Sequence, residues 1–324
     1  MSAGTFELTM LGGPWGRRLR PRRAWIDELP WDEALPHDAV DARVVWTRTA
    51  FSEYASAAAF AEVAAALLAA GAPIDLVAAA GDFVVDEIVH TEAAARTAIA
   101  LGGAVALEID LERLVRPARA ADPLIRAAEM VVRVSCVGEA MTVSMLKLSR
   151  RVAGSALIDA VLGRVIADES HHAQLGWWFL DWAEPRLDGD SRAHLGRTAG
   201  DALSAFAPIL TPELTSVELS ELRCQGFALS RSAVDFDGSL ADTVGTPSDP
   251  QFARSGRHRR TVGPGGGCTA SGLGALACDR YDPAFAAGAR RVAGALAERG
   301  IDVPADDLAA VGAVAAPGAT GPPG

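Results

Sequence analysis

The sequence predicts an all-α protein whose centre is a bundle of four long helices. Three observations support this fold class. Alanine supplies much of the apolar half of the 324-residue chain, and alanine has the highest intrinsic helix propensity. Long helical patterns recur between residues 47 and 184, and the connections between them alternate short, long, short. That order is typical of a four-helix bundle in which one connection crosses the length of the bundle.

The first two predicted helices form a hairpin. The stretch from Thr47 to Ala70 is rich in alanine and other helix formers. Gly71 and Pro73 end this helix and begin the next, which we expect to continue to Leu101. A connection this short places the two helices antiparallel and side by side.

A second hairpin follows after a long connection. Residues 102–123 are too many for a tight turn and are expected to cross the bundle. The third helix is expected from Leu124 to Arg150, and the fourth from Ala156 to Glu184, where Pro185 ends it. The stretch VAGS (152–155) between them forms a short turn.

The remaining parts of the chain differ in composition. The tryptophan-, proline- and arginine-rich start has no sustained period, and a later stretch is dominated by turn formers. Two further helices are expected at Ser191–Ile209 and Thr211–Arg231. The expected layout is an irregular N-terminal arm (1–46), a helical bundle with the functional site (47–231), a flexible linker (232–281), and a short helix with a low-complexity tail (282–324).

The overall charge and the cysteines exclude several classes of protein. A formal net charge of -11 opposes nucleic-acid binding, which needs a concentrated basic surface. The four cysteines form no C-x-x-C pair, which argues against a zinc ribbon or a rubredoxin-like site. Glu62 and Asp75 interrupt the alanine-rich region, and no export signal is apparent. We therefore expect a soluble, cytoplasmic protein without a membrane span.

Two similar words point to the chemistry. DEIVH, from Asp86 to His90, and DESHH, from Asp168 to His172, each place a glutamate three residues before a histidine. Residues three apart on a helix lie on the same face, so each pair offers one oxygen and one nitrogen to a metal ion. Taken singly, each word also fits an exposed face with salt bridges.

The third helix offers a partner for these pairs. Glu139 lies near its middle and Glu129 lies near its start. Glu139 is about as far before the turn into the fourth helix as Glu169 is after it. An antiparallel hairpin therefore brings Glu139 and Glu169 level.

The first helix offers two candidates, and their height along the bundle decides between them. With about 1.5 Å of rise per residue, Glu53 lies about 26 Å before the turn at Gly71, and Glu62 only about 12 Å before it. The Glu87 and His90 pair lies about 21 to 26 Å after the same turn. Glu53 therefore matches the height of the pair, whereas Glu62 misses it.

The predicted ligand set supplies four carboxylates and two imidazoles. Four carboxylates balance the charge of two divalent ions and leave coordination positions open, which suits iron or manganese better than a closed zinc site. Asp86 and Asp168 each precede a ligand glutamate and are expected to accept the second ring N–H of a metal-bound histidine. The predicted metal ligands are Glu53, Glu87, His90, Glu139, Glu169 and His172.

With these residues in place, the chain resembles the ferritin-like di-iron carboxylate superfamily. The resemblance covers roughly Thr47 to Glu184 and includes the order of the six ligands, the helix pairing and the crossover. The residues around Glu53 (Glu53, Ala55, Ser56 and Phe60) resemble the first helix of ferritins and bacterioferritins. Two D-E-x-x-H words resemble the oxygen-activating branch, which includes bacterial multicomponent monooxygenases, arylamine N-oxygenases and ribonucleotide reductase small subunits. The resemblance implies two iron ions, with manganese or a mixed pair as alternatives.

Departures from that pattern narrow the function that the resemblance implies. A ribonucleotide reductase small subunit needs a tyrosine where this chain has Ala94, and a rubrerythrin needs cysteine knuckles that this chain lacks. The expectation is a di-iron oxygenase or oxidase that uses O₂ to hydroxylate, N-oxygenate or desaturate a small organic substrate. Electrons are expected from a reductase or ferredoxin, and a homodimer is compatible with such a bundle. A ferritin- or rubrerythrin-like ferroxidase and an interaction module that has kept the ligands are the alternatives.

Three further residues are candidates for the pocket beside the metal ions. Cys136 precedes Glu139 by one turn and also fits a small core residue. Thr142 follows Glu139 by one turn and is a candidate hydrogen-bond donor, but a bond to its own helix explains it equally well. Ala94 leaves room for a substrate or for close helix packing.

Overall fold

The computed structural model describes residues 13–37, 39–105, 114–206 and 278–312, with the short pieces 4–5, 8, 108–109 and 273. These residues are almost entirely helical. The exception is one antiparallel pairing of two residues each, β1 (Gly4–Thr5) with β2 (Glu108–Ile109). The predicted all-α class is confirmed.

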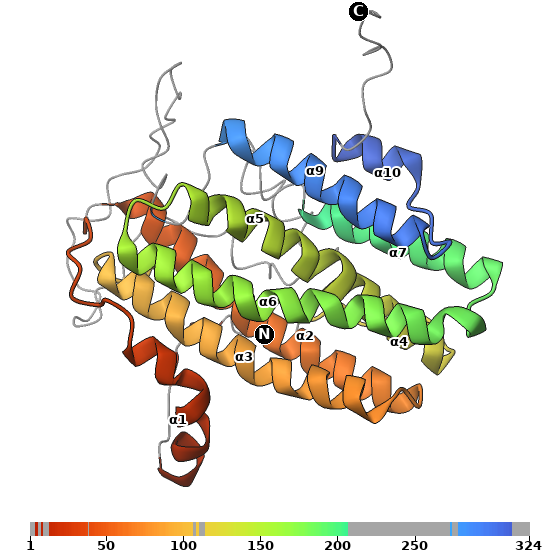
Figure 1. Cartoon of the computed structure of the whole chain (residues 1–324), viewed down its shortest axis with the longest axis horizontal. Helices are drawn as coiled ribbons and strands as arrows, with labels where there is room; N and C mark the ends of the chain where they lie inside the picture. Colours follow the sequence, from red (N-terminus) through yellow and green to blue (C-terminus); the bar gives the residue numbers. More distant parts are fainter. Residues whose placement is uncertain are drawn as a thin grey trace, which may run out of the picture.

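Long helices make up the body of the molecule (Figure 1). In chain order the helical elements are α1 (Gly13–Asp27), α2 (Val40–Ala69), α3 (Ile74–Ala100), α4 (Pro123–Val131), the π-helix η2 (Val132–Glu139), α5 (Ala140–Arg151), α6 (Ala156–Ala183), the short 3₁₀ turn η3 (Glu184–Arg186), α7 (Gly189–Phe206), α9 (Cys278–Ala297) and α10 (Ala305–Ala310).

Two helical hairpins lie side by side in the bundle. The first joins α2 to α3 through a turn in which Gly71 has a φ of 63°, a left-handed conformation that glycine adopts without strain. In the second, the continuous helix formed by α4, η2 and α5 returns as α6, whose first turn is capped by the Ser155 hydroxyl. The end of α3 and the start of α4 lie at opposite ends of the bundle (Figure 1). At its end Asp122 caps α4 by accepting from the backbone N–H groups of Leu124 and Ile125.

The helix expected at Leu124–Arg150 contains a stretch of wider turns. Residues 132–139 form a π-helix, which ends at Glu139. A π-helix pairs each residue with the fifth along the chain, so it inserts an extra residue into a turn and rotates the residues that follow. Such insertions are frequent at functional sites.

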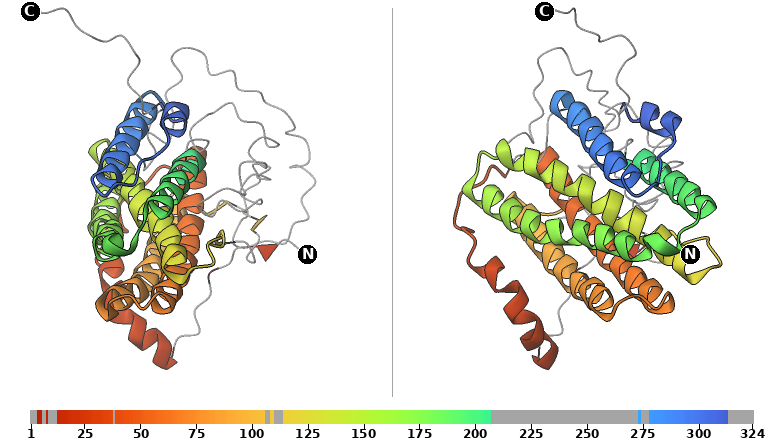
Figure 2. Two further views of the ribbon diagram at one scale, coloured as in Figure 1. Left: turned by 90° about the vertical axis from the view of Figure 1, so that its right-hand side faces the viewer. Right: turned by 45° about the vertical axis from the view of Figure 1, so that its right-hand side comes forward.

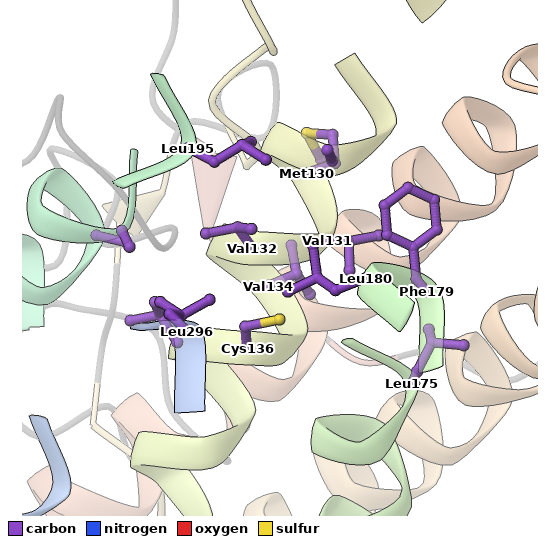
Figure 3. Close-up of a cluster of buried hydrophobic side chains, with 14 of the residues drawn as sticks. Met130, Val131, Val132, Val134, Cys136, Leu175, Phe179, Leu180, Leu195 and Leu296 are labelled. Atoms are coloured by element: carbon purple, nitrogen blue, oxygen red, sulfur yellow. The ribbon is translucent and has the colours of Figure 1, made fainter. Parts of the chain in front are cut away.

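Two apolar clusters fill the interior, one toward each end of the α2–α3 hairpin. The first includes Phe60, Phe83 and Leu175, and Figure 3 shows the part of it in which Cys136 of η2 lies near Leu175 of α6. The second includes Trp46 and Ile166. On α2, α3 and α6 the predicted metal ligands fall between the residues of one cluster and those of the other, so the site is enclosed along the bundle.

The N-terminal part of the chain differs from the expected irregular arm. Residues 13–27 form α1, and α2 begins at Val40 rather than at Thr47. The extension of α2 packs Ala42 and Trp46 into the second apolar cluster. Helix α1 is attached to α3 largely by ion pairs between residues that lie far apart in the sequence. Its sequence therefore lacks the apolar periodicity from which a packed helix is usually predicted.

The C-terminal part also differs in its bounds. Helix α7 agrees closely with the helix expected at Ser191–Ile209, whereas α9 begins inside the expected linker and α10 stands where only a tail was expected. Phe285, Val292 and Leu296 of α9 belong to the first apolar cluster, so this segment shares the core of the bundle. The turned views show α9 packed across α5 (Figure 2). The helix expected at Thr211–Arg231, residues 232–272 of the expected linker and residues 313–324 of the tail lie outside the described residues.

One helix of the described residues, over Ala42–Ala69, is long and apolar enough to cross a membrane by length and composition alone. Half of its most apolar window is buried inside the protein. A core helix has the same composition when one broad face packs against its neighbours, and α2 packs along the whole of α3 (Figure 1).

A carboxylate from outside the bundle holds the start of α6. Glu33 accepts hydrogen bonds from the Ser155 hydroxyl at 3.0 Å and from the backbone N–H of Leu157 at 2.7 Å. Replacing Glu33 by glutamine should lower the free energy of unfolding by about 1 kcal/mol, because one of the two accepting oxygens and a favourable charge at a helix N-terminus are lost. Urea denaturation of the variant tests this, with Asp32→Asn as the control at an exposed neighbouring carboxylate. Equal stabilities of the two variants would contradict the assignment.

Candidate metal centre

The structure brings all six predicted ligand residues together in the interior of the bundle. Glu53 comes from α2, Glu139 is the last residue of η2, and α3 and α6 each contribute a glutamate and a histidine. None of the six side chains belongs to a residue that is more than 8% exposed. The two words that are far apart in the sequence thus face each other across the contact between α3 and α6.

The six residues form two groups of four that share two members. Glu53, Glu87, His90 and Glu169 make the first group, which we call the His90 half. Glu87, Glu139, Glu169 and His172 make the second, the His172 half. In each group one ligand atom from every residue lies within 4.8 Å of the others, a spacing that allows all four to bind one ion. Glu87 and Glu169 belong to both groups.

Both histidines present the same ring nitrogen to the cluster. Nδ1 of His172 lies 2.9 Å from a carboxylate oxygen of Glu87 and 2.9 Å from one of Glu169. Nδ1 of His90 lies 3.3 Å from Glu169 and 3.8 Å from Glu53. The Nε2 atoms point away from the cluster, so Nδ1 is the nitrogen that is free to bind a metal ion.

The two predicted aspartates lie behind the histidines, each on the opposite helix. Asp168 of α6 lies 3.2 Å from Nε2 of His90 on α3. Asp86 of α3 lies 3.6 Å from Nε2 of His172 on α6, an ion-pair contact that is longer than a hydrogen bond, and this Nε2 has no hydrogen-bond partner among the described residues. A carboxylate at this position orients the ring and fixes the tautomer that leaves Nδ1 unprotonated. Each D-E-x-x-H word therefore supports the histidine of the other word.

Several polar atoms of the site are buried without a hydrogen-bond partner. Among the described residues these include both carboxylate oxygens of Glu87, Nδ1 of His90 and Oε1 of Glu139. A buried polar atom without a partner costs free energy, and a buried carboxylate costs more. A bound cation would satisfy these atoms and balance part of the carboxylate charge, so the residues present could hold a metal ion.

The electrostatics of the metal-free cluster favour protonated outer carboxylates. Burial raises the pKa of Glu53 to about 8, and the nearby Glu87 and Glu169 add to this effect. Burial together with the charges of Glu169 and Glu87 raises the pKa of Glu139 well above its usual range. Without a cation, these two groups stay neutral because the site cannot hold four uncompensated negative charges.

The pKa shifts of the two histidines and of Glu169 instead favour their charged forms. Burial lowers the pKa of His172, but Asp86, Glu169 and Glu87 outweigh it and raise the pKa to about 12. Burial likewise opposes the charged form of His90, whose pKa is nevertheless raised by Asp168, Glu169 and Glu53. Burial raises the pKa of Glu169, but its contacts with the two histidines lower the pKa below its usual range. Protonated histidines thus replace metal ions as the positive charges of the metal-free site.

Aromatic rings enclose the His172 half on one side. The ring centre of Phe83 lies 4.2 Å from that of His172, and the ring centre of Phe60 lies 5.1 Å from it. Phe60 is two helical turns after Glu53, and Phe83 is one turn before Glu87. These spacings are a sequence signal from which both rings were predictable as neighbours of the site. Their apolar faces limit the access of water to the imidazole.

The candidate pocket residues have different positions. Cys136 is fully buried and faces Gly176 of α6; burial raises the pKa of its thiol, which makes it a core residue with an unreactive thiol. Ala94 is buried in the second apolar cluster. Thr142 is half-buried on α5. None of these three belongs to either ligand group.

Three other polar residues near the predicted ligands, on α2, α4 and η2, have different surroundings. Glu62 is exposed, and Glu129 is engaged by the backbone N–H groups of Arg119 and Ala120, so neither competes with the chosen ligands. Ser135, one turn before Glu139, is fully buried, and its hydroxyl has no partner among the described residues. Periodicity alone does not distinguish such a serine from a small core residue.

No protein-family model matches this sequence, and no curated protein or solved structure is significantly similar to it. Support for a function therefore comes from the residues of the chain itself.

Metal loading is expected to release protons. Glu53, Glu139 and both histidines hold protons in the metal-free chain because their pKa values are raised. A ligand atom has to lose its proton before it binds a cation, so we expect about two or more protons to be released per chain near pH 7. Calorimetric titration with ferrous iron in buffers of different ionisation enthalpy measures this number. Loading without proton release would contradict the protonation described above.

The stability of the metal-free chain should fall as the pH rises. The pKa of Glu53 is about 8 in the folded chain against an ordinary 4.5, so its contribution is complete below 4.5 and is lost as the pH rises through 8. The pKa of His172 is also raised, from 6.5 to about 12, so its contribution to stability is complete below 6.5 and is lost as the pH rises through 12. The lowered pKa of Glu169 matters only at more acidic pH. From about pH 5 to 8, the difference in melting temperature between the loaded and metal-free chains should therefore widen. A difference that narrows would contradict this sign.

Proposed function

We propose that the chain is a di-iron oxygenase or oxidase with a ferritin-like four-helix bundle, which uses O₂ to oxidise a small organic substrate. The observation that carries the proposal is the convergence of the six ligand residues into two overlapping groups of four. The arrangement of α2, α3, α4 to α5 and α6, with its one long connection, supports the bundle assignment.

The ligand chemistry favours iron. Two imidazoles and four carboxylates give each ion a mixed nitrogen and oxygen environment, and the shared carboxylates leave coordination positions for other molecules. A structural zinc site is usually closed by four ligands and rich in thiolate, whereas Cys136 lies outside both groups. Manganese or a mixed pair of ions fits the same ligands.

Iron bound in this site would supply the redox chemistry for O₂, and the chain would supply position and environment. Glu87 and Glu169 hold the two halves at a fixed separation because each belongs to both groups. Asp86 and Asp168 orient the imidazoles of His172 and His90. Phe60 and Phe83 exclude water from the His172 half.

The burial of the site favours oxidation of a small molecule over mineral storage. Glu87 and His172 are fully buried, and apolar clusters lie on both sides along the bundle. A dry, preorganised site suits a reaction whose reactive species has to be kept from water. A reductase or ferredoxin would return electrons between turnovers.

Anaerobic loading with ferrous iron tests the proposal. Purified chain should bind about two iron ions, since four carboxylates and two histidines are a ligand set for a pair of ions. Mixing with O₂ should then produce a transient visible absorption band. A chain that binds no iron would contradict the proposal. A large hollow assembly that accumulates many iron atoms per chain would indicate storage instead.

A further inference from the structure

Helix α1 lies on the outer side of the two helices that carry the histidine ligands. It packs against α3 (Figure 1). Its arginines form ion pairs with carboxylates of that helix. Arg22 forms an ion pair with Asp82 at 2.6 Å and a second one with Asp86. Asp86 is the carboxylate behind His172, so an arginine of α1 is two contacts away from a predicted metal ligand.

The two oxygens of Asp86 have separate partners. Oδ1 accepts a hydrogen bond from Arg22, and Oδ2 is the oxygen that lies 3.6 Å from Nε2 of His172. The Asp86 side chain is only 15% exposed. Arg22 therefore fixes the rotation of the carboxylate and leaves the other oxygen directed toward the imidazole. A charge-assisted hydrogen bond of this kind is stronger and more directional than a bond between neutral groups.

The His90 half has a different arrangement. Nε of Arg164 lies 3.2 Å from Oδ2 of Asp168, the same oxygen that faces His90. The Arg164 guanidinium lies 5.7 Å from the centre of the Trp25 ring on α1. A guanidinium over an aromatic face is held by a cation–π interaction. Helix α1 thus contacts this half through Trp25 and only indirectly.

Other contacts hold α1 in place independently of Arg22. Arg23 pairs with Glu92 of α3 at 2.6 Å, and Arg96 of α3 pairs with Asp27 at 3.3 Å. Ile26 is fully buried in the second apolar cluster. Loss of the Arg22 charge should leave α1 docked, so the contribution of Arg22 to the site can be measured separately from the attachment of the helix.

We propose that Arg22 is a positioning residue for the His172 half of the metal centre, acting through Asp86. The inference rests on the proposed function, because it assigns Arg22 a role toward metal ions in that same site. The role is specific: Arg22 orients the carboxylate that orients His172, and it has no such contact with the His90 half. Loss of Arg22 therefore weakens one of two metal sites.

The test compares metal affinities of variants under anaerobic conditions, with ferrous iron alone as the probe. Arg22→Gln should bind one equivalent as the unsubstituted chain does and the other about 10- to 100-fold more weakly, the usual loss when a partner behind a ligand histidine is removed. Glu139→Gln identifies the equivalent that belongs to the His172 half, since Glu139 is a member of that half alone. Arg22→Lys should restore part of the affinity. Arg17→Gln, at an exposed arginine of the same helix, is the matched control and should bind as the unsubstituted chain does.

A double-mutant cycle separates positioning from a general structural role. In an Asp86→Asn background, Arg22→Gln should cause little further loss, because the carboxylate through which it acts is gone. Melting of the metal-free variants should differ little from that of the unsubstituted chain.

If Arg22→Gln binds both equivalents normally while the unsubstituted chain binds two ions, the role of Arg22 is overturned and the proposed function stands. Equal weakening of both sites also overturns it. An unsubstituted chain that binds no iron overturns the proposed function itself.

Discussion

Replacing Glu87 by glutamine is expected to abolish the binding of both metal ions without weakening the metal-free fold. Glu87 belongs to both ligand groups, so the substitution removes a ligand from each ion at once. Loss of a partner behind a ligand costs about 10- to 100-fold in metal affinity, and loss of a shared ligand should cost more than about 100-fold at each site. Glutamine has nearly the same shape and keeps one oxygen, so packing around the fully buried side chain is preserved.

The effect on the metal-free chain distinguishes a metal site from an ordinary buried network. After burial, the charge of Glu87 is one cause of the raised pKa values of Glu53 and Glu139. Removing that charge relieves this repulsion but also takes away a negative charge that lies 2.9 Å from the protonated His172. The two effects oppose each other, so the melting temperature of metal-free Glu87→Gln at pH 8 should stay close to that of the unsubstituted chain. Neither carboxylate oxygen makes a hydrogen bond of good geometry among the described residues, and glutamine keeps an oxygen that can lie at the 2.9 Å contact with Nδ1 of His172.

Two matched substitutions on α2 complete the experiment. Glu53→Gln should weaken the His90 half only, because Glu53 belongs to that group alone. Glu62→Gln, at an exposed glutamate of the same helix, should change neither metal binding nor stability. Isothermal titration with ferrous iron and thermal unfolding of the metal-free variants provide both readouts. If Glu87→Gln kept two tight sites, its placement as a bridging ligand would be wrong.

A second large effect is expected from Gly176→Ala, which should separate η2 from α6. A Cβ atom at position 176 would lie 2.5 Å from Sγ of Cys136 and 3.0 Å from the backbone nitrogen of Cys136. The backbone atom cannot move aside as a flexible side chain can, so the helices have to move apart. Overpacking of this kind costs about 1–3 kcal/mol of stability. Because Glu139 is three residues after Cys136 and His172 is four before Gly176, the His172 half should also lose metal affinity.

The chain offers a control and a compensating change for this experiment. Gly81 lies in α3 with no heavy atom near its Cβ direction among the described residues, so Gly81→Ala should raise stability by about 0.5–1 kcal/mol. Cys136→Ala removes the closest atom and should recover part of the loss in the Gly176→Ala chain. Chemical denaturation and iron titration measure the two effects. Equal behaviour of the two glycine variants would contradict the close contact between η2 and α6.

The sequence was sufficient to predict which six side chains lie together, because their placement depends on local spacing and on helix length. Residues three apart share a helix face, which identified the pairs at Glu87 and Glu169, and helix rise selected Glu53 over Glu62. The structure places Glu62 on the surface and Glu53 in the cluster. A crossover was expected because residues 102–123 are too many for a tight turn between antiparallel neighbours.

Features that depend on contacts between distant residues were not predictable. Helix α1 was expected to be irregular because its pairing partners, such as Asp86 and Glu92, lie far along the chain. The crossed pairing of each aspartate with the histidine of the other word depends on the rotation of α3 against α6, which spacing does not determine. The π-helix before Glu139 has no sequence signal comparable to a cap, since it changes hydrogen bonding within an otherwise continuous helix.

X-ray diffraction at the iron absorption edge, from crystals grown anaerobically with ferrous iron, tests the central claim most directly. We predict two anomalous peaks: one among Glu53, Glu87, His90 and Glu169, and one among Glu87, Glu139, Glu169 and His172. Iron should lie on the Nδ1 side of both imidazoles. Peaks only at the protein surface, or no peak between α3 and α6 in crystals that contain bound iron, would contradict the assignment of this cluster as a di-metal centre.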